Sequence, residues 1–183
     1  AEWLEIQRTT GAGGKLSIRE ALVADAQEIA ALRVAAADDL TARFGNGFWS
    51  SNTTEKGVML GINGGKVLIA THASEIVGTL TLSTRKPWAI DANCFAKVKT
   101  PIYLTSMAVE PKLQGQGVGR ELLVAAEQAA RKWPAQSIRL DAFDADPSSS
   151  NRCCIAENMR HGPAPAVVGR VVLKDAHADR VVV

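Results

Sequence analysis

Three glycines stand at alternate positions in the stretch "LQGQGVGRELL", between an apolar segment and an amphipathic one. Glycine loses more conformational freedom on folding than any other residue, so Gly115, Gly117 and Gly119 need a reason. The first turn of an α-helix carries backbone N–H groups without intrahelical partners and a partial positive charge. A glycine-rich approach lets an anion reach those amides without Cβ atoms in its way. The spacing therefore favours a binding site for a di- or polyphosphate.

The side chains around these glycines agree with a phosphate site. Arg120 lies in the first turn of the expected helix, where a cation opposes the helix dipole unless an anion sits in front of it. Gln114 adds a neutral donor at the start of the same turn. The alternative is a tight strand-to-helix turn with an incidental surface arginine. The spacing departs from the dinucleotide fingerprint, and the Gly-Lys-Ser/Thr ending of a P-loop does not occur.

The glycine-rich stretch lies between an expected strand and an expected helix. Pro101 precedes the strand-like segment "IYLTSMAV", at the one end of a strand where proline is tolerated. After the glycines, apolar residues recur at helical spacing until Pro134 stops the helix. Their stripe consists of Val118, Leu122, Ala125 and Ala129, widened by Leu123, Ala126, Ala130 and Trp133.

Other periodic segments surround this unit. Residues 23–45 read as a helix, because Asp25 and Glu28 have the spacing of a capping box and Gly45 follows the last turn. A short second helix is expected within 53–65. Further strands are expected at 15–21, on both sides of a turn within 66–84, at 137–143, and as a hairpin in 166–183. The pattern predicts one α/β (α+β) domain over residues 15–183, with residues 1–14 as an N-terminal extension.

Composition limits the class of protein. The chain has 183 residues, enough for one domain with a real core, and 46% of them are hydrophobic. The net charge of +2 favours no polyanion, so no nucleic-acid partner is expected. No run approaches the roughly 18 apolar residues of a membrane span. The first 20 residues lack the apolar core of a signal peptide, which makes a cytoplasmic location the expectation.

The cysteines and histidines indicate neither a disulfide framework nor a metal site. The three cysteines are an odd number, and the adjacent Cys153 and Cys154 are poorly placed to pair with each other. The three histidines are scattered and complete no zinc spacing with a cysteine pair. We therefore expect reduced thiols and no structural metal.

The segment "MAVEPKLQGQGVGRELL" closely resembles the acyl-CoA-binding motif of the GNAT superfamily of N-acetyltransferases. That motif is Gln or Arg, two residues, Gly, one residue, then Gly or Ala, and Gln114, Gly117 and Gly119 match it. The Val-Glu-Pro step before the loop and the Leu-Leu pair after it are also usual there. The segment "SIREALVADAQEIAAL" resembles the first strand and helix of the family. In element order the resemblance spans roughly residues 16–143.

The resemblance implies a fold and a binding mode for acetyl-CoA. The fold would be a central mixed, mostly antiparallel β-sheet flanked by helices, with strands that splay apart at the CoA site. Backbone groups of the splayed strand would bind the pantetheine arm, and amides of the glycine-rich loop would bind the pyrophosphate. An Asn after the fifth strand is also usual. The implied cofactor-binding residues are Met107, Ala108, Val109, Gln114, Gly115, Gln116, Gly117, Val118, Gly119, Arg120 and Asn151.

The catalytic residues are less well marked. Many family members carry a carboxylate on the splayed strand, and this strand has none. Tyr103 on the strand and Glu110 just past its end are the candidates for acid–base chemistry. For Glu110 the alternative is a turn residue, and for Tyr103 it is packing within the sheet.

The C-terminal part departs from the family pattern. The resemblance implies a helix over 151–162 with a Tyr that protonates the leaving thiolate, but Asn158 stands in its place. Asn cannot act as a general acid. Either solvent or another residue supplies the proton, or this segment is divergent. Pro163 likewise replaces the family's aromatic residue.

The sequence thus predicts an N-acetyltransferase that moves an acetyl group from acetyl-CoA to a primary amine by direct attack. The acceptor would be a small molecule or a peptide amino terminus, selected by the first helices and residues 85–100. The alternative is a catalytically inactive acyl-CoA-binding regulatory module. A membrane partner is not expected, and a homodimer stays open.

Overall fold

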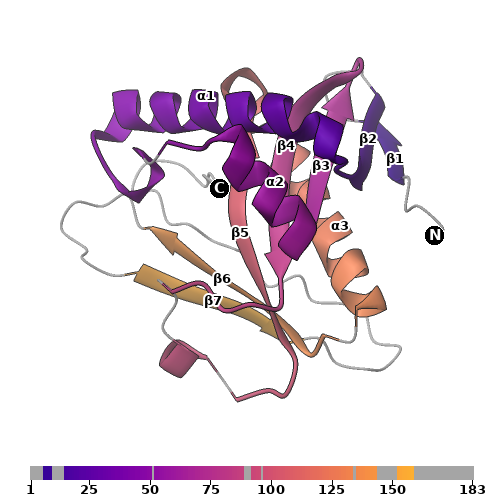
Figure 1. Cartoon of the computed structure of the whole chain (residues 1–183), viewed down its shortest axis with the longest axis vertical. Coiled ribbons are helices and arrows are strands. Elements are labelled where there is room, and N and C mark those ends of the chain that lie inside the picture. Colours follow the sequence, from indigo (N-terminus) through magenta and orange to yellow (C-terminus); the bar gives the residue numbers. More distant parts are fainter. Residues whose placement is uncertain are drawn as a thin grey trace.

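A computed structural model describes residues 6–9, 15–50, 52–88, 92–95, 97–133, 135–143 and 152–158. These residues form one twisted sheet with helices on both faces (Figure 1). The strands are β1 (Ile6–Thr9), β2 (Lys15–Glu20), β3 (Lys66–His72), β4 (Glu75–Ser83), β5 (Pro101–Val109), β6 (Ser137–Phe143) and β7 (Arg152–Asn158). The helices are α1 (Ala26–Phe44), α2 (Glu55–Gly64) and α3 (Val118–Lys132), with short 3-10 turns between them.

The strands of the described sheet lie in chain order from β1 to β7. Each neighbouring pair is antiparallel except β5 and β6, which are parallel. Parallel neighbours need a crossover connection, and α3 supplies it between β5 and β6. The sheet is therefore mixed and mostly antiparallel, as the family resemblance implied.

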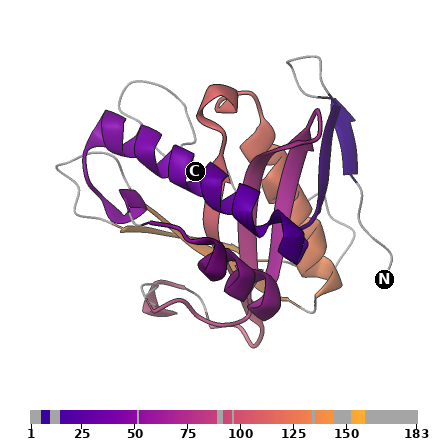
Figure 2. The same cartoon turned by 45° about the horizontal axis from the view of Figure 1, so that its top comes forward.

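Helices α1 and α2 cover one face of the sheet, and α3 covers the other (Figures 1 and 2). We call these the α1 face and the α3 face. The core on the α1 face joins Ile29 and Leu32 of α1 to Val67 and Ile69 of β3. The core on the α3 face is larger and contains, among others, Leu16, Ile18, Leu68, Leu80, Leu82, Ile102, Leu104, Val118, Leu122, Ala126 and Ile138.

Helix α3 packs closely on the middle of the sheet. Its buried side chains, Val118, Leu122, Ala125, Ala126 and Ala130, belong to the expected stripe. A Cβ at Gly78 of β4 would lie 2.8 Å from Leu122 Cδ1 and 3.0 Å from Val118 Cγ1. Since real Cβ contacts are never that short, the bare backbone of Gly78 allows this approach.

Most of the elements expected from the sequence are confirmed, and two segments differ. Part of the expected N-terminal extension, Ile6–Thr9, joins the sheet as β1 beside β2. Residues 152–158 form β7, antiparallel to β6, so the helix implied there by the family resemblance is wrong for this chain. The adjacent Cys153, Cys154 and Ile155 suit a strand, because β-branched and apolar residues fit a pleated surface. The hairpin expected at 166–183 lies outside the described residues.

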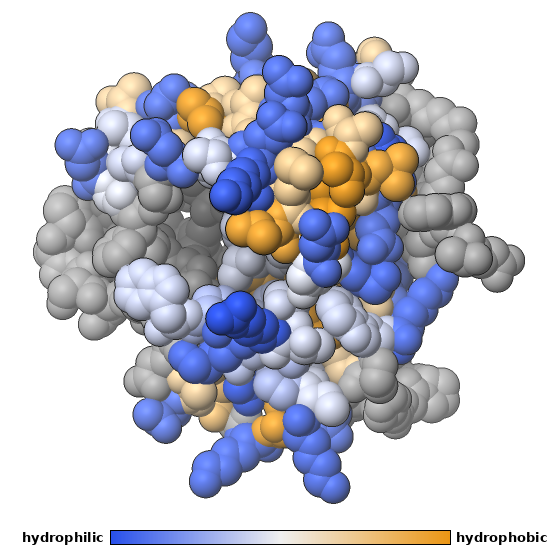
Figure 3. All heavy atoms as spheres, viewed as in Figure 1, coloured by the Kyte–Doolittle hydropathy of each residue, from blue (hydrophilic) through white to orange (hydrophobic). Residues whose placement is uncertain are grey.

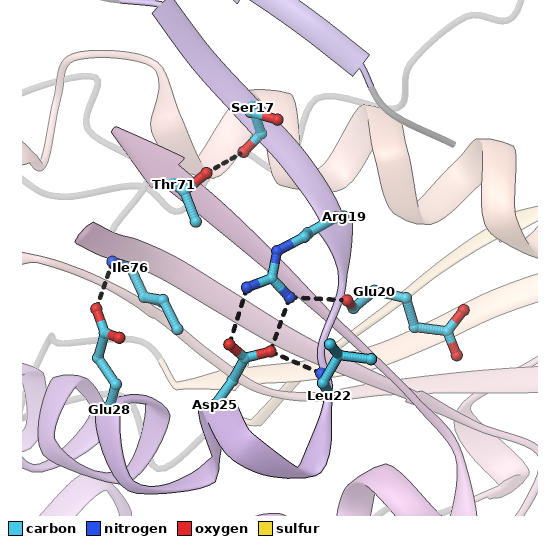
Figure 4. Close-up of polar contacts among 8 residues, drawn as sticks. All are labelled: Ser17, Arg19, Glu20, Leu22, Asp25, Glu28, Thr71 and Ile76. Atoms are coloured by element: carbon cyan, nitrogen blue, oxygen red, sulfur yellow. Dashed lines mark hydrogen bonds and ion pairs between the residues drawn. The ribbon is translucent and has the colours of Figure 1, made fainter. Parts of the chain in front are cut away.

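The entry into α1 is held by an ion pair between β2 and the turn before the helix (Figure 4). Arg19 Nη1 and Nη2 donate to the two carboxylate oxygens of Asp25 at 2.7 and 2.8 Å. The amide of Leu22 donates to Asp25 Oδ2 at 2.6 Å. The Arg19 hydrogen bond lowers the pKa of Asp25, and the same bond raises the pKa of Arg19.

The capping box expected between Asp25 and Glu28 does not form. Glu28 instead reaches across to the sheet, where its Oε1 accepts from the amide of Ile76 at 2.7 Å (Figure 4). Asp25 is occupied by Arg19 and Leu22. Both carboxylates thus hold the start of α1 against the sheet instead of capping the amides of their own helix.

The surface on the α1 side is mostly hydrophilic, with apolar side chains gathered mainly around α2 (Figure 3). Leu60 of α2 is 65% exposed there. No helix in the described part of the chain combines the length and the apolar composition needed to cross a bilayer.

Replacing Asp25 by Asn is expected to lower the free energy of unfolding at neutral pH by about 1 kcal/mol. The value is modest because the Arg19 side chain is 37% exposed to solvent. Since folding lowers the pKa of Asp25, its contribution is complete above the unfolded pKa of about 3.9 and is lost as the pH falls through the folded value. Urea unfolding of both proteins across this range measures the difference.

The matched control is Glu127→Gln, which breaks the exposed i, i+4 pair with Arg131 on α3. It is expected to change stability by less than about 0.5 kcal/mol. A difference between Asp25→Asn and wild type that stays constant down to the lowest pH at which both fold would contradict the role given to the ion pair.

Candidate functional site

The central feature of the site is the divergence of β5 from β6. The two strands pair only from Pro101 to Tyr103, opposite Ser137 to Arg139. On its other side β5 stays paired with β4 as far as Val109, which lies opposite Gly78. Figure 1 shows β6 running away from the upper part of β5. The backbone groups of 104–109 that face β6 therefore have no strand partner in the described part of the chain.

Strand β5 also carries a bulge at the point of divergence. Thr81 lies opposite Thr105 and Thr79 lies opposite Ala108, so two residues of β5, Ser106 and Met107, face the single residue between Thr79 and Thr81. Ser106 has a positive φ of 53°, which is uncommon for a residue other than glycine. A bulge of this kind redirects the strand and its backbone groups.

The turn after β5 is held by backbone and side-chain bonds. The amide of Glu110 donates to Val77 O at 2.9 Å, and the carbonyl of Glu110 accepts from Leu113 N at 2.8 Å. Gln114 Nε2 donates to Val109 O at 3.3 Å. Gln114 Oε1 in turn accepts from Arg43 Nη2 at 3.2 Å, near the end of α1. Gln114 therefore links the end of β5 to the C-terminal end of α1.

The three glycines of the loop serve two different structural roles. Gly115 and Gly117 have φ values of 75° and 92°, and a Cβ on either would meet no atom within 4 Å. Gly119 lies in the first turn of α3, and its Cβ would lie 3.3 Å from Met107 Cε and 3.7 Å from Val109 Cγ2. The first two thus shape a loop with open space before it, while the third allows α3 to approach β5.

The N-terminus of α3 presents free donors to this space. The first bond of the helix runs from Glu121 N to Gly117 O at 3.1 Å. The amides of Val118, Gly119 and Arg120 come before it, and none of them has a backbone acceptor in the described part of the chain. Arg120 is exposed beside them. Gln116 instead uses its side chain within the loop, where Nε2 donates to Lys112 O at 2.9 Å.

The two candidate acid–base residues lie in different settings. Tyr103 is only 4% exposed, and its hydroxyl accepts from Arg139 Nη1 at 3.3 Å. The Arg139 guanidinium lies 5.9 Å from the centroid of the Tyr103 ring and 5.0 Å from that of Phe95. Glu110 is half-buried, and its backbone holds the turn described above. The two residues lie at opposite ends of the unpaired part of β5.

The predictions for the segment after the fifth strand are not supported by the described residues. Asn151 lies outside the described residues. Asn158 ends β7 opposite Ser137, so it does not project from a helix. The described part of the chain also brings together no group of three or more His, Cys, Asp or Glu side chains that could hold a metal ion.

Sequence analysis missed Arg33, which lies on the sheet-facing side of α1. Its Nη2 donates to Thr81 Oγ1 at 3.1 Å, and its buried Nε has no hydrogen-bond partner among the described residues. Burial lowers the pKa of the Arg33 guanidinium to about 10. The signal was present in the sequence, because Arg33 follows Ile29 by four positions and precedes Ala36 by three, which places it in the buried stripe.

The described residues thus combine a strand that splays from its neighbour, a bulge on that strand and a glycine-rich loop that leads into the N-terminus of α3. The chain matches the model of the acetyltransferase (GNAT) family over residues 33–151, more than half of its length. It therefore belongs to the GNAT acetyltransferase family. A search of curated proteins finds no match.

Solved structures share the fold at low sequence identity. An acetyltransferase of the GNAT family from Listeria monocytogenes is 16% identical, with a TM-score of 0.65, and the match covers 84% of this chain and 100% of that one. The GNAT domain of PAT from S. lividans is 17% identical, with a TM-score of 0.64 and coverage of 85% and 97%. PaiA N-acetyltransferase from Thermoplasma acidophilum, solved in complex with coenzyme A, is 14% identical, with a TM-score of 0.61 and coverage of 79% and 99%.

Replacing Gly117 by Asn is expected to weaken the binding of CoA by about tenfold or more while the protein stays folded. Asn tolerates the left-handed conformation of this position better than most residues other than glycine do, and no atom of the described residues lies within 4 Å of the Cβ that it would add. Calorimetric titration with CoA measures the affinity, and thermal unfolding checks the fold. Val is a poor probe here, because a β-branched residue at a φ of 92° would strain the backbone as well.

The control is Gly64→Asn at the end of α2, where an added Cβ also meets no atom within 4 Å. This variant is expected to bind CoA as wild type does. Equal affinity of Gly117→Asn and wild type would refute the phosphate site at this loop.

Proposed function

We propose that the protein is an acyl-CoA-dependent N-acetyltransferase that moves an acetyl group from acetyl-CoA to a primary amine. The observation that carries this proposal is the unpaired, bulged end of β5 beside the free amides of α3. One edge of backbone groups and one cluster of helix N-terminal amides lie at successive places on a single chain segment, from Thr105 to Arg120. A thioester on a long amide-bearing arm that ends in a pyrophosphate fits this order of donors.

The donor would lie along this segment. The free backbone of Met107, Ala108 and Val109 suits the amide groups of the pantetheine arm, which add hydrogen bonds where β6 has diverged. The amides of Val118, Gly119 and Arg120 suit the pyrophosphate, since they are unpaired and lie at the positive end of the helix dipole. The open space before Gly115 and Gly117 leaves room for phosphate oxygens.

The reaction would be a direct acyl transfer. The free amine attacks the carbonyl carbon of the thioester, the N–C bond forms, and the C–S bond breaks to release the thiolate. The amine gives up one proton and the thiolate takes one. A backbone N–H of the bulged strand near Met107 would stabilise the negative charge that develops on the carbonyl oxygen. Binding both substrates in line supplies the rest of the rate enhancement.

Water rather than a single side chain would carry the proton from the amine. Tyr103 is buried and bonded to Arg139, and Glu110 lies in the turn beyond the strand. Neither residue is a carboxylate on the splayed strand, which is where many family members hold their base. Solvent that enters beside the unpaired edge of β5 provides the alternative route.

Release of free thiol from acetyl-CoA, measured across a panel of primary amines and peptide amino termini, tests the proposal. Amine-dependent release with a matching acetylated product supports it. Tight binding of acetyl-CoA without turnover on any member of a broad panel would instead favour a regulatory acyl-CoA-binding module.

Arg120→Ala is expected to weaken CoA by about tenfold or more, because a charge-assisted bond to phosphate is lost. Pantetheine carries the thiol arm but no phosphate, so its affinity is expected to stay the same. The control is Arg131→Ala, which removes an exposed arginine from the other end of α3. Calorimetry with both ligands decides the matter, and equal losses for CoA and pantetheine would assign Arg120 to the fold instead.

Glu110→Gln and Tyr103→Phe are each expected to lower turnover by less than about tenfold, since a dedicated general base is worth roughly 100- to 10,000-fold. Turnover is measured at several pH values with the best amine from the panel, and thermal unfolding accounts for the bond that Tyr103 makes with Arg139. A fall of several orders of magnitude in either variant, with the fold intact, would identify that residue as the base and remove the water route.

A further inference from the structure

A row of polar side chains lies on the α1 face of the sheet, where an apolar layer would be expected. Along β4, Gly78, Leu80 and Leu82 point to the α3 face. Thr79 and Thr81 alternate with them and point to the α1 face, as the bond from Arg33 to Thr81 shows. Thr79 is fully buried, and its Oγ1 has no hydrogen-bond partner in the described part of the chain.

The row continues onto β5 at the bulge. Thr105 lies opposite Thr81 in the antiparallel pair, and Tyr103 lies opposite Ser83. Paired residues share a face of the sheet, so these side chains also point toward α1. Thr105 and Ser83 are half-buried, and the row therefore reaches solvent next to Ser106, where β5 leaves the regular register.

Arg33 supplies a positive charge to this row. Helix α1 crosses in front of β4 and β5 (Figure 1), and Arg33 extends from it to Thr81. No carboxylate in the described part of the chain lies within ion-pair distance of Arg33, although Arg19, Arg43 and Arg131 each have such a partner. Burial of a guanidinium without a counter-charge is costly, and burial of its Nε without any hydrogen-bond partner adds to the cost.

Two buried polar atoms on the α1 face, Arg33 Nε and Thr79 Oγ1, have no hydrogen-bond partner among the described residues. An anionic group with two oxygens meets both the charge and the forked geometry of a guanidinium. The row ends on the part of β5 that no longer pairs with β6, which is the strand to which the thioester was assigned above. Neighbouring strands are only about 5 Å apart, so Thr81 lies one strand from the bulge.

We propose that Arg33 binds a carboxylate of the acceptor, and that the acceptor is therefore an amine that also carries a carboxylate, such as a free amino acid. The inference rests on the proposed function, because it places the amine of the same molecule at the thioester. Thr105, which is half-buried at the end of the row, then bonds to polar groups between the two ends. Uncharged and purely cationic amines lack the group that satisfies Arg33.

The experiment compares amino acids with their own carboxamides, which keep the amine and lose the negative charge. Glycine, β-alanine and γ-aminobutyrate, each paired with its amide, vary the distance between the two groups. The wild-type protein is expected to prefer the acid over the amide by about 10- to 100-fold in kcat/KM for at least one pair. The preference should come from KM for the acceptor.

Arg33→Gln is expected to bring the ratio of acid to amide close to one, with KM for acetyl-CoA unchanged. Acid and amide also differ in the basicity of their amines. This difference affects wild type and Arg33→Gln equally, so it cancels when their acid-to-amide ratios are compared. The control is Arg131→Gln, an exposed substitution on α3 that is expected to keep the wild-type ratio. No preference in wild type, or a preference that survives in Arg33→Gln, would overturn the inference.

A binding measurement separates this inference from the proposed function. The protein saturated with CoA, which cannot transfer an acyl group, is titrated with each acid and each amide by calorimetry. Acids that bind to wild type but not to Arg33→Gln support the carboxylate site even if no amine is acetylated, and in that case the acetyltransferase proposal alone fails. If amides are acetylated as readily as acids, the acetyltransferase proposal stands and the carboxylate site at Arg33 fails.

Thermal unfolding of Arg33→Met distinguishes a ligand-binding arginine from one that holds α1 to the sheet. An unpaired buried charge destabilises the free protein, so this apolar replacement of similar length is expected to keep or raise the melting temperature. A drop of more than about 5 °C, as expected for the loss of roughly 1 kcal/mol or more of native contacts, would assign Arg33 to the fold and contradict the proposal.

Discussion

The site depends on the early end of the pairing between β5 and β6. In a continuous sheet the backbone groups of β5 beyond Tyr103 would hydrogen-bond to β6, as those on the other edge of β5 bond to β4. Buried backbone groups without partners are costly, so a strand that leaves its neighbour must find other bonds or face solvent. The bulge at Ser106 and the crossover through α3 direct this free edge and the free amides of the helix to the same region. Under the proposed function, an extended ligand with amide and phosphate groups would take the place of the missing strand.

The two substrates would meet different kinds of chemistry on the two sides of this opening. The donor side consists of backbone amides and glycines, which depend on the path of the chain more than on side-chain identity. The proposed acceptor side would consist of side chains on the α1 face, namely Arg33, Thr81 and Thr105. A change of acceptor therefore needs only a few substitutions on α1 and β4, whereas a change of donor would need a different backbone. Such a division would allow one fold to serve different acceptors.

The sequence predicted the strands and helices well where their periodicity was strong. The stripe of α3, the strand after Pro101 and the end of α1 at Gly45 were all correct. The glycine-rich loop was located by its spacing, although Gly119 proved to serve packing against Met107. Local patterns could not reveal which partner a carboxylate chooses. Glu28 bonds to the amide of Ile76, 48 positions away, in place of the local cap that its spacing suggested.

The failures have the same physical origin. The strand at 152–158 depends on pairing with β6, and the family's helix at this position gave the opposite expectation. Arg33 was overlooked because a single arginine in an apolar stripe is usually a side chain that extends to solvent along its aliphatic part. Only the register of β4 and β5 shows that it points to Thr81 and not to water. Pairing between distant segments thus decided what the local sequence could not.

Helix α1 contacts both sides of the proposed site, through its middle and through its last turn. Its start is fixed to the sheet by Asp25 and Glu28, and Ile29 packs in the apolar core beside β3. Because these contacts secure the first turns, the middle of the helix can carry a buried arginine at a cost that the fold tolerates. Its last turn holds Arg43, which bonds to Gln114 in the glycine-rich loop. One helix therefore extends from Arg33, on the proposed acceptor side, to the loop proposed to bind the donor.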